Sequence, residues 1–354
     1  MNHSERLKKL LEKAIQENAS DLHLSVEHPP ILRITGKLIP LIKEEKLMPE
    51  NTESFAFSLM TNIQKEEFLR KKEIDFSYDF EGRARFRINV FFQREWISVS
   101  LRLIPKKIRT IEELNLPAIL HQFTAKTQGF VLITGASSQG KSTTLAALIN
   151  EINHTKPCHI ITIEDPIEYV FEDDKAIVDQ REVYQDTLSF AQALKSTFRQ
   201  DPNVIMVGEM RDLETMSITL TAAETGHLIF ATLHTNSAAQ SIHRIVDVFP
   251  SEQQNQIRSQ LSGTLLAVVS QRLIPRLKGG FIPSCEVMTC TSAIANLIRE
   301  NKIHEIPAVI ETSKKAGMIS FNRSLADLVR KGEISLHDAL FYSSSPVELK
   351  SMLK

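Results

Sequence analysis

Hydrophobic and polar positions follow different patterns in the two halves of the chain. In the first half, apolar residues recur three and four positions apart over residues 7–15, which predicts an amphipathic helix. A second helical pattern covers 50–60, and short strands are expected at 22–26, 31–34, 38–41, 76–80, 86–92 and 97–103. Strands this close in sequence favour an antiparallel sheet, so residues 1–108 are expected to form a mixed α+β domain.

From residue 130 onward, apolar runs alternate with helical stretches. The runs lie at 130–134, 159–163, 204–207 and 228–232. Strands that are buried on both faces read as continuous apolar runs, so this pattern predicts a mainly parallel sheet with helices on both sides. We expect an α/β core over residues 118–285 and a helical region over 286–354.

The two halves are joined by a polar segment with prolines near its ends. Pro105 and Pro117 flank a stretch that contains several charges and Thr110, and we place a linker at 109–117. A chain of 354 residues is long enough for about two domains, which agrees with this division.

Composition excludes several classes of protein. A net charge of −1 argues against a general nucleic-acid binder. The three cysteines, Cys158, Cys285 and Cys290, lack the paired short spacings of a structural zinc site. The apolar stretches are shorter than the roughly 20 residues of a membrane-spanning helix, and the N-terminus shows no secretory signal. We therefore expect a cytosolic protein with no membrane span.

The most specific motif follows the apolar run at 130–134. It matches the phosphate-loop pattern G-x-x-x-x-G-K-[ST], and a helix is expected directly after it, over 142–152. A chance glycine-containing turn is the alternative, and the strand and helix on either side argue against it. The candidate nucleotide-binding residues are Gly135, Ala136, Ser137, Ser138, Gln139, Gly140, Lys141, Ser142 and Thr143.

Each part of this loop has a chemical role in binding a nucleoside triphosphate. Glycines let backbone N–H groups turn toward the phosphate oxygens, and the helix presents its positive N-terminal end to the same anion. Lys141 would contact the β- and γ-phosphates, and the Ser142 hydroxyl would bind Mg²⁺. The expected cofactors are therefore ATP and Mg²⁺.

Two carboxylates follow buried strands at the edge where a doubly wound sheet binds its ligand. Glu164 follows the run at 159–163, and Glu209 comes after the run at 204–207 and Gly208, whose backbone can turn close to the nucleotide. Hydrolysis needs a group that orients water in line with the γ-phosphate, and both carboxylates are candidates. The alternative for each is a solvent-exposed helix cap.

Two histidines, His227 and His234, bracket the apolar run at 228–232. An imidazole beside the nucleotide can sense the γ-phosphate or stabilise charge that develops on it. A structural role is more frequent for a single histidine, but a pair at the two ends of this strand slightly favours a functional one.

Three longer motifs resemble those of the type II/IV secretion ATPase superfamily. Residues 162–168 are similar to its Asp box, residues 201–212 to a Walker B motif that uses glutamate, and residues 221–236 to its His box. Within the superfamily, the chain looks most like the type IV pilus retraction (twitching motility) ATPases, over nearly its whole length.

The resemblance implies a PAS-like α+β N-terminal domain, a RecA-like P-loop ATPase core and assembly as a homo-hexamer. It further implies a motor that hydrolyses ATP between the two domains and removes pilin subunits from the pilus base. Such a motor would be cytoplasmic and peripheral at the inner membrane. Its partners would be an inner-membrane platform protein and, indirectly, pilin.

The same resemblance implies roles for individual residues. Glu209 would be the catalytic carboxylate and Glu164 would support Mg²⁺ or water, while Arg87 and Arg102 match N-terminal-domain arginines that reach the phosphates. An arginine on a mobile domain neutralises transition-state charge only when that domain closes. The alternative for both arginines is an exposed strand residue. The full candidate catalytic set is Glu209, Lys141, Glu164, His234, His227, Arg87 and Arg102.

Four positions depart from the family pattern. Ala136 replaces a proline, and Ser138 replaces a glycine, which fits only if Ser138 has a negative φ. Ala295 replaces an arginine linked to retraction, and Asn322 replaces an acidic residue.

Other functions are compatible with these motifs. The chain could be an accessory retraction ATPase, another secretion motor, or a nucleotide-gated assembly factor with little turnover. A nucleic-acid translocase is a further alternative, against which the near-neutral charge and the aromatic content of 6% argue.

Overall fold

The computed structural model describes residues 3–34, 36–104 and 106–354. The chain separates into two units: unit 1 comprises Met1–Lys107 and Asp165–Val170, and unit 2 comprises Ile108–Glu164 and Phe171–Lys354. Pro105, which helped to place the linker, lies outside the described residues.

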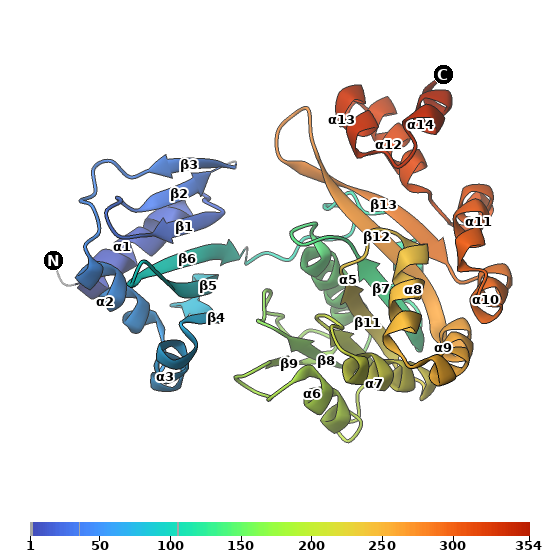
Figure 1. The fold of residues 1–354 in the computed structure, drawn as a ribbon, viewed down its shortest axis with the longest axis horizontal. Helices are drawn as coiled ribbons and strands as arrows, with labels where there is room; N and C mark the ends of the chain where they lie inside the picture. Colours follow the sequence, from blue (N-terminus) through green and yellow to red (C-terminus); the bar gives the residue numbers. More distant parts are fainter. Residues whose placement is uncertain (1–2, 35, 105) are drawn as a thin grey trace. The chain divides into compact units, whose positions relative to one another are not determined.

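Unit 1 is built on a six-stranded antiparallel sheet with the strand order β3-β2-β1-β6-β5-β4 (Figure 1). Its core joins helix and sheet side chains such as Leu11, Phe55 and Val99, each at most 1% exposed. The strands are β1 (Asp21–Leu24), β2 (Ile31–Ile34), β3 (Lys37–Pro40), β4 (Glu73–Phe80), β5 (Ala84–Gln93) and β6 (Trp96–Ile104), and the helices are α1 (His3–Gln16), α2 (Pro49–Leu59) and α3 (Asn62–Lys71).

Helix α3 was not anticipated from the apolar pattern. It begins with a capping box, in which the Thr61 side chain accepts from the Gln64 backbone N–H and the Gln64 side chain accepts from the Thr61 N–H. This reciprocal pair is a sequence-level start signal for a helix. The spacing of Thr61 and Gln64 could therefore have identified α3.

Unit 2 contains a seven-stranded sheet with the order β13-β12-β7-β11-β10-β8-β9 (Figure 1). All neighbouring pairs are parallel except β12 with β13. Strands β7, β10 and β11 are buried at every position, which requires cover on both faces and confirms the expected α/β arrangement. The strands are β7 (Gly129–Thr134), β8 (His159–Glu164), β9 (Ile177–Glu182), β10 (Val204–Val207), β11 (Leu228–Leu233), β12 (Leu265–Pro275) and β13 (Phe281–Thr289).

Helices of unit 2 enclose this sheet and form the C-terminal part of the chain. Apolar residues of α6 to α11 share one core with β7, β8, β10, β11 and β12, and α12 to α14 form a separate cluster with the β12–β13 hairpin. The helices are α4 (Leu120–Thr124), α5 (Lys141–Thr155), α6 (Phe190–Thr197), α7 (Leu213–Glu224), α8 (Ala238–Val248), α9 (Ser251–Thr264), α10 (Ser292–Arg299), α11 (Ile306–Thr312), α12 (Phe321–Arg330), α13 (Leu336–Tyr342) and α14 (Pro346–Leu353), with short 3₁₀ turns at Ile303–Glu305 and Lys314–Ala316.

The helical region begins later than residue 286, because β13 continues to Thr289 and α10 starts at Ser292. The sequences of β12 and β13 show no regular alternation of polar and apolar residues, so the apolar pattern did not predict these two strands. Strand β9 is a partly exposed edge strand with a largely polar sequence, so it had no apolar signal either. Within the described residues, no helix is long and apolar enough to cross a membrane.

Candidate active site

The phosphate-loop motif connects the end of β7 to the start of α5. Gly135, Ser138 and Gly140 all have positive φ angles, of 150°, 63° and 81° respectively. Gly140 directly precedes Lys141, the first residue of α5. The loop therefore turns the chain sharply from a buried strand into the N-terminus of a 15-residue helix, where the first backbone N–H groups make no bond within the helix and attract anions.

Ser138 contradicts the expectation of a negative φ. Its φ of 63° lies in the left-handed region, which costs a non-glycine residue roughly 1–2 kcal/mol because Cβ approaches the carbonyl oxygen. The Ser138 side chain is exposed. The loop therefore keeps the left-handed geometry of a glycine at a position occupied by serine.

The Lys141 ammonium lies within the loop. Its Nζ donates to the backbone carbonyls of Gly135 and Ala136, both at 2.9 Å, and the residue is only 8% exposed. A buried ammonium is stabilised by such polar partners. Lys141 is thus held beside the loop backbone, where the motif requires a cation for the phosphates.

Glu209, His234 and the loop meet at the carboxyl ends of β10, β11 and β7. One Glu209 carboxylate oxygen lies 2.7 Å from Arg211 Nε and 3.4 Å from His234 Nε2, and the other His234 nitrogen lies 3.5 Å from Ser137 Oγ. Glu209 is mostly buried, with a side chain 12% exposed. His234 therefore bridges the candidate catalytic carboxylate and the phosphate loop.

Gly208 places Glu209 close to the neighbouring strand. Its N–H donates to Ile163 O at 2.8 Å, and a Cβ at this position would lie 3.1 Å from the same carbonyl. On the other side, Thr232 Oγ1 donates to Gly208 O at 2.5 Å. The backbone before Glu209 is fixed from both neighbouring strands, in keeping with the turn expected at this glycine.

Glu164 is the last residue of β8 and is 7% exposed. Its Oε1 accepts hydrogen bonds from Thr162 Oγ1 at 2.6 Å and from Gln180 Nε2 at 3.1 Å. It lies on the strand next to β10, at the same sheet edge as Glu209. The helix-cap alternative does not apply to Glu164, because no helix begins there.

His227 is not part of this group. It precedes β11, and its carbonyl accepts from Gly129 N–H at the start of β7, whereas the phosphate loop follows the end of β7. A six-residue strand spans roughly 20 Å, so His227 lies at the opposite edge of the sheet from His234. Its Nδ1 is 3.0 Å from Ala222 O and 3.1 Å from Thr225 Oγ1, contacts that tie it to the end of α7. The pair of histidines brackets one strand, and for that reason only one of them can be near the loop.

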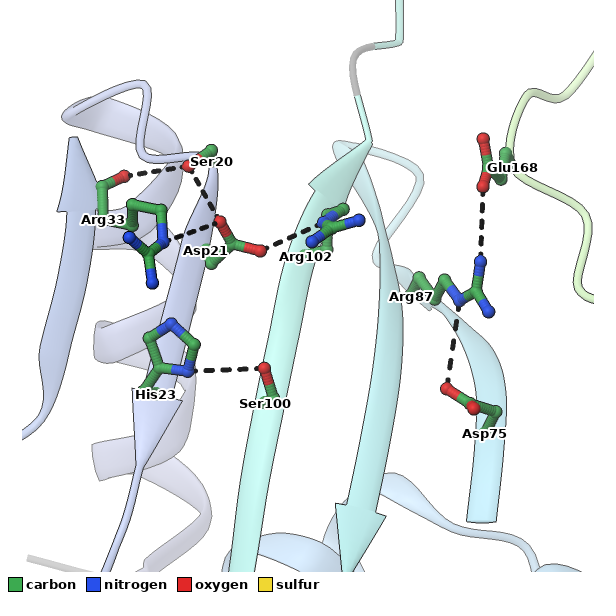
Figure 2. A network of polar contacts seen from close by, with 9 residues as sticks. All are labelled: Ser20, Asp21, His23, Arg33, Asp75, Arg87, Ser100, Arg102 and Glu168. Atoms are coloured by element: carbon green, nitrogen blue, oxygen red, sulfur yellow. Dashed lines mark hydrogen bonds and ion pairs between the residues drawn. The ribbon is translucent and has the colours of Figure 1, made fainter. Parts of the chain in front are cut away.

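Arg102 and Arg87 belong to unit 1 and lie in one row across its sheet. Asp21 on β1 pairs in register with Arg33 on β2 and Arg102 on β6, and Arg102 pairs with Arg87 on β5. Figure 2 shows Asp21 between Arg33 and Arg102. Arg102 Nε lies 3.0 Å from Asp21 Oδ1, and Arg33 Nε lies 3.5 Å from Asp21 Oδ2.

The Asp21 carboxylate was not identified from the sequence. Its side chain is only 9% exposed, whereas that of Arg102 is 56% exposed, so a buried carboxylate holds an exposed guanidinium. An acidic residue at the start of a short strand with two buried leucines is the signal that could have identified it. Arg87 has looser partners, Glu168 at 3.4 Å and Asp75 at 3.8 Å (Figure 2).

The residues at the sheet edge that carries the phosphate loop are suited to binding Mg²⁺ together with a nucleotide. Within the part of the chain that the structure describes, no group of three or more His, Cys, Asp and Glu side chains could hold a metal ion. Mg²⁺ in nucleotide sites is held mainly by phosphates and water with one or two protein ligands. The exposed Ser142 at the first turn of α5 and the carboxylate of Glu164 are ligands of the required kind.

The two C-terminal departures lie away from the loop. Asn322 is 2% exposed, and its Nδ2 donates to Glu348 Oε2 at 2.9 Å and to Ser345 O at 3.2 Å, while its Oδ1 accepts from Ser343 Oγ at 2.7 Å. An aspartate here would lose both donated bonds and lie against Glu348. Asn322 therefore ties α12 to the start of α14. Ala295 lies on α10, and nothing in the structure explains its replacement of arginine.

Comparisons with known proteins identify the family of the chain. The family model described as "Type II/IV secretion system protein" matches residues 3–317. The type IV pilus retraction ATPase PilT of Pseudomonas aeruginosa is 46% identical over 330 residues, which cover 93% of this chain and 96% of that protein. The type IV pilus ATPase PilU of the same species is 41% identical, over 98% of this chain and 91% of that protein.

Solved structures lead to the same family. A crystal structure of the pilus retraction motor PilT with bound ADP has a TM-score of 0.89 at 45% identity and covers 97% of this chain and 98% of that one. The ATPase DotB of Legionella pneumophila has a TM-score of 0.81 at 27% identity and covers 95% of this chain and 94% of that one. The resemblance to pilus retraction ATPases and the expected fold class, an N-terminal domain followed by a RecA-like core, are thereby confirmed. The chain belongs to the type II/IV secretion system protein family.

Proposed function

We propose that this chain is the ATP-hydrolysing motor of type IV pilus retraction, working as a homo-hexamer that removes pilin subunits from the pilus base. The observation that carries the proposal is the contact of Glu209 with His234, which itself contacts Ser137 of the phosphate loop. The similarity to PilT over nearly the whole of both chains supports the retraction role. The proposed place of action is the cytoplasmic face of the inner membrane, through a platform protein.

Binding of the triphosphate is proposed for the loop and the first turn of α5. The Lys141 ammonium would exchange its carbonyl partners for phosphate oxygens, and the helix N-terminus adds N–H donors. Mg²⁺, held by Ser142 and Glu164, would neutralise part of the phosphate charge. Together these groups position the γ-phosphate at the edge where Glu209 lies.

Glu209 is proposed to orient the attacking water. A carboxylate at this position accepts a proton from water as the bond to phosphorus forms, and His234 lies where it can stabilise charge near the γ-phosphate. Arg211 Nε, 2.7 Å from a Glu209 carboxylate oxygen, holds the carboxylate in place. Arg87 and Arg102 are proposed to reach the phosphates when the N-terminal domain moves, which would couple hydrolysis to motion.

Steady-state release of phosphate from ATP tests the catalytic part of the proposal. Glu209→Gln should lower turnover by about 100-fold or more, because an amide cannot accept the proton. Glu214→Gln is a matched control, since Glu214 is an exposed carboxylate on α7 paired with Lys195, and it should leave turnover unchanged. Equal, near-zero rates for the wild-type chain and Glu209→Gln would instead favour a nucleotide-gated assembly factor. Stimulation of turnover by DNA would favour a translocase.

Retraction itself requires a cellular test. A strain that lacks its own retraction motor should regain twitching when it expresses this chain, and Glu209→Gln should fail to restore it. Rescue only in the presence of a second, active retraction motor would assign the chain an accessory role like that suggested by its 41% identity to PilU. No rescue together with normal ATP turnover would contradict the retraction role and leave the ATPase role intact.

A further inference from the structure

Strand β12 lies beside β7 and carries a buried polar residue, Gln271, next to the phosphate loop (Figure 1). Gln271 is 2% exposed. Its Nε2 donates to the backbone carbonyl of Gln139 at 2.7 Å, and its Oε1 accepts from Thr144 Oγ1 at 2.8 Å. One side-chain amide thus joins the loop to the first turn of the helix that follows it.

The connection is reciprocal. The Gln139 side chain accepts a hydrogen bond from Leu273 N–H at 2.6 Å, so each glutamine side chain binds the backbone of the other segment. The two loop glycines also lie directly against Gln271. A Cβ on Gly135 would lie 2.5 Å from Gln271 O, and a Cβ on Gly140 would lie 2.8 Å from Gln271 Nε2. The absence of side chains at Gly135 and Gly140 therefore leaves room for β12 to pack against the loop.

The direction of the Gln139 carbonyl determines the direction of an N–H group of the loop. In a planar trans peptide, the C=O of one residue and the N–H of the next point in opposite directions. Because Gln271 holds Gln139 O toward β12, the N–H of Gly140 is directed away from β12. Gly140 immediately precedes Lys141, where a phosphate-loop motif directs its N–H groups at phosphate.

We propose that Gln271 is a positioning residue for the nucleotide, which sets the orientation of the Gln139–Gly140 peptide and fixes the loop against α5. The proposal rests on the phosphate-binding role of the loop given above. An apolar side chain of similar size would fill the same space but would leave Gln139 O and the Thr144 hydroxyl without these partners, and buried polar groups without partners are costly. The Gln139–Gly140 peptide would then be free to rotate away from the geometry that binds phosphate.

Titration of the full-length chain with ADP tests this role without relying on turnover. Gln271→Met keeps the length and apolar volume of the side chain but removes both hydrogen bonds, and it should raise the Kd for ADP by about 10-fold, equivalent to about 1.4 kcal/mol. In the ATPase assay, the KM for ATP should rise more than kcat falls, since an interaction made equally in the bound and transition states affects KM.

The neighbouring residue Arg272 provides a matched control. It lies on the opposite face of β12, where its Nη1 donates to Tyr342 O at 3.1 Å and its guanidinium lies 4.5 Å from the centre of the Phe321 ring. Arg272→Met should lower the urea midpoint of unfolding to a similar extent as Gln271→Met but should change the Kd for ADP by less than about twofold. An equal loss of affinity in both variants would show a general effect of weakening β12 and would overturn the proposal.

A second variant keeps the test decisive if Gln271→Met does not fold. Gln271→Asn retains an amide but is one methylene too short to span Gln139 O and Thr144 Oγ1, and it should also raise the Kd for ADP severalfold. Unchanged affinity in a folded Gln271 variant would overturn the positioning role while leaving the phosphate-loop assignment intact. Failure of the wild-type chain to bind ADP would overturn both.

Discussion

Lys141 and Arg102, two cations that are candidates for binding the phosphates, are held in opposite ways. Lys141 in unit 2 is 8% exposed and donates to two carbonyls of its own loop. Arg102 in unit 1 has a side chain that is 56% exposed, and its Nε binds the carboxylate of Asp21. The difference indicates one cation buried within the loop itself and another held at the surface of unit 1 by a single carboxylate.

The energetics of the two arrangements follow from exposure. An ion pair that reaches solvent contributes about 0–1 kcal/mol, because water screens it and the long side chain must be ordered. A buried ammonium without polar partners would be far more costly, so Lys141 needs polar partners in every state, either the loop carbonyls or the phosphate oxygens that replace them. Arg102 binds Asp21 through Nε, and such a guanidinium has further N–H groups with which to bind a second anion. We therefore expect the loop to bind nucleotide in every state and the arginine row to act in only some states.

Loss of the buried cation should give the largest effect. Lys141→Ala removes the ammonium from the loop and should lower ATP turnover by about 1,000-fold, because no other loop side chain carries a positive charge to the phosphates. Lys156→Ala, at the far end of α5, is a matched control that should retain activity. The measurement is steady-state phosphate release together with the Kd for ADP. Unchanged turnover in Lys141→Ala would exclude the phosphate-loop assignment.

Loss of the exposed cation should have a smaller and different effect. Arg102→Ala should lower kcat by about 10- to 100-fold and leave nucleotide affinity nearly unchanged, because a group that acts only after domain movement stabilises the transition state selectively. Arg33→Ala removes the other arginine that contacts Asp21 and should have little effect on kcat. A loss of affinity with unchanged kcat in Arg102→Ala would argue that this arginine is part of the ground-state binding site.

The loop that holds Lys141 contains a residue with a strained backbone, Ser138. Ser138→Gly should raise the free energy of unfolding by up to about 1 kcal/mol, since glycine adopts the φ of 63° without the Cβ clash, although its greater freedom in the unfolded chain offsets part of the gain. Ser137→Gly, at the exposed neighbouring position, should not stabilise the chain. Thermal and urea unfolding of both variants measure the difference, and a destabilised Ser138→Gly protein would mean that the hydroxyl makes a needed contact.

The smallest effect is expected at a cation of intermediate exposure, His121, which lies at the linker end of unit 2. Its ring nitrogens lie 2.6 Å from Glu151 on α5 and 2.7 Å from Glu112, and its side chain is 38% exposed. The hydrogen bond to Glu151, reinforced by Glu112, raises the pKa of His121 above its ordinary value despite partial burial. The stabilising charge is thus fully present below the unfolded pKa of about 6.5 and is lost as pH rises through the raised folded pKa.

The urea midpoint of the wild-type chain should therefore be lower at about pH 8.5 than at about pH 6, and this decrease should be smaller in His121→Gln. Glutamine keeps hydrogen-bonding capacity but does not titrate, so it isolates the charge. The same pH dependence in both proteins would place the responsible group elsewhere.

The sequence was most informative where function depends on local spacing. The loop at 135–142, with its preceding strand and following helix, could be predicted because the glycines and Lys141 act through the backbone geometry of a short segment. Glu209 and Glu164 could be identified as candidates because each lies at or just beyond the carboxyl end of a buried strand of a parallel sheet, where these ends meet at one edge. The alternation of apolar runs with helices was enough for the α/β core.

Only the tertiary structure determined which distant residues become partners. It separated His227 from His234, because two residues at opposite ends of one strand lie at opposite edges of the sheet. It assigned Ser138 a left-handed φ, and it brought Asp21 to Arg102 and Gln271 to Gln139 through the order of the strands. Strand order depends on packing the whole core, and a segment of sequence encodes its own backbone preferences but not the segment that will lie beside it.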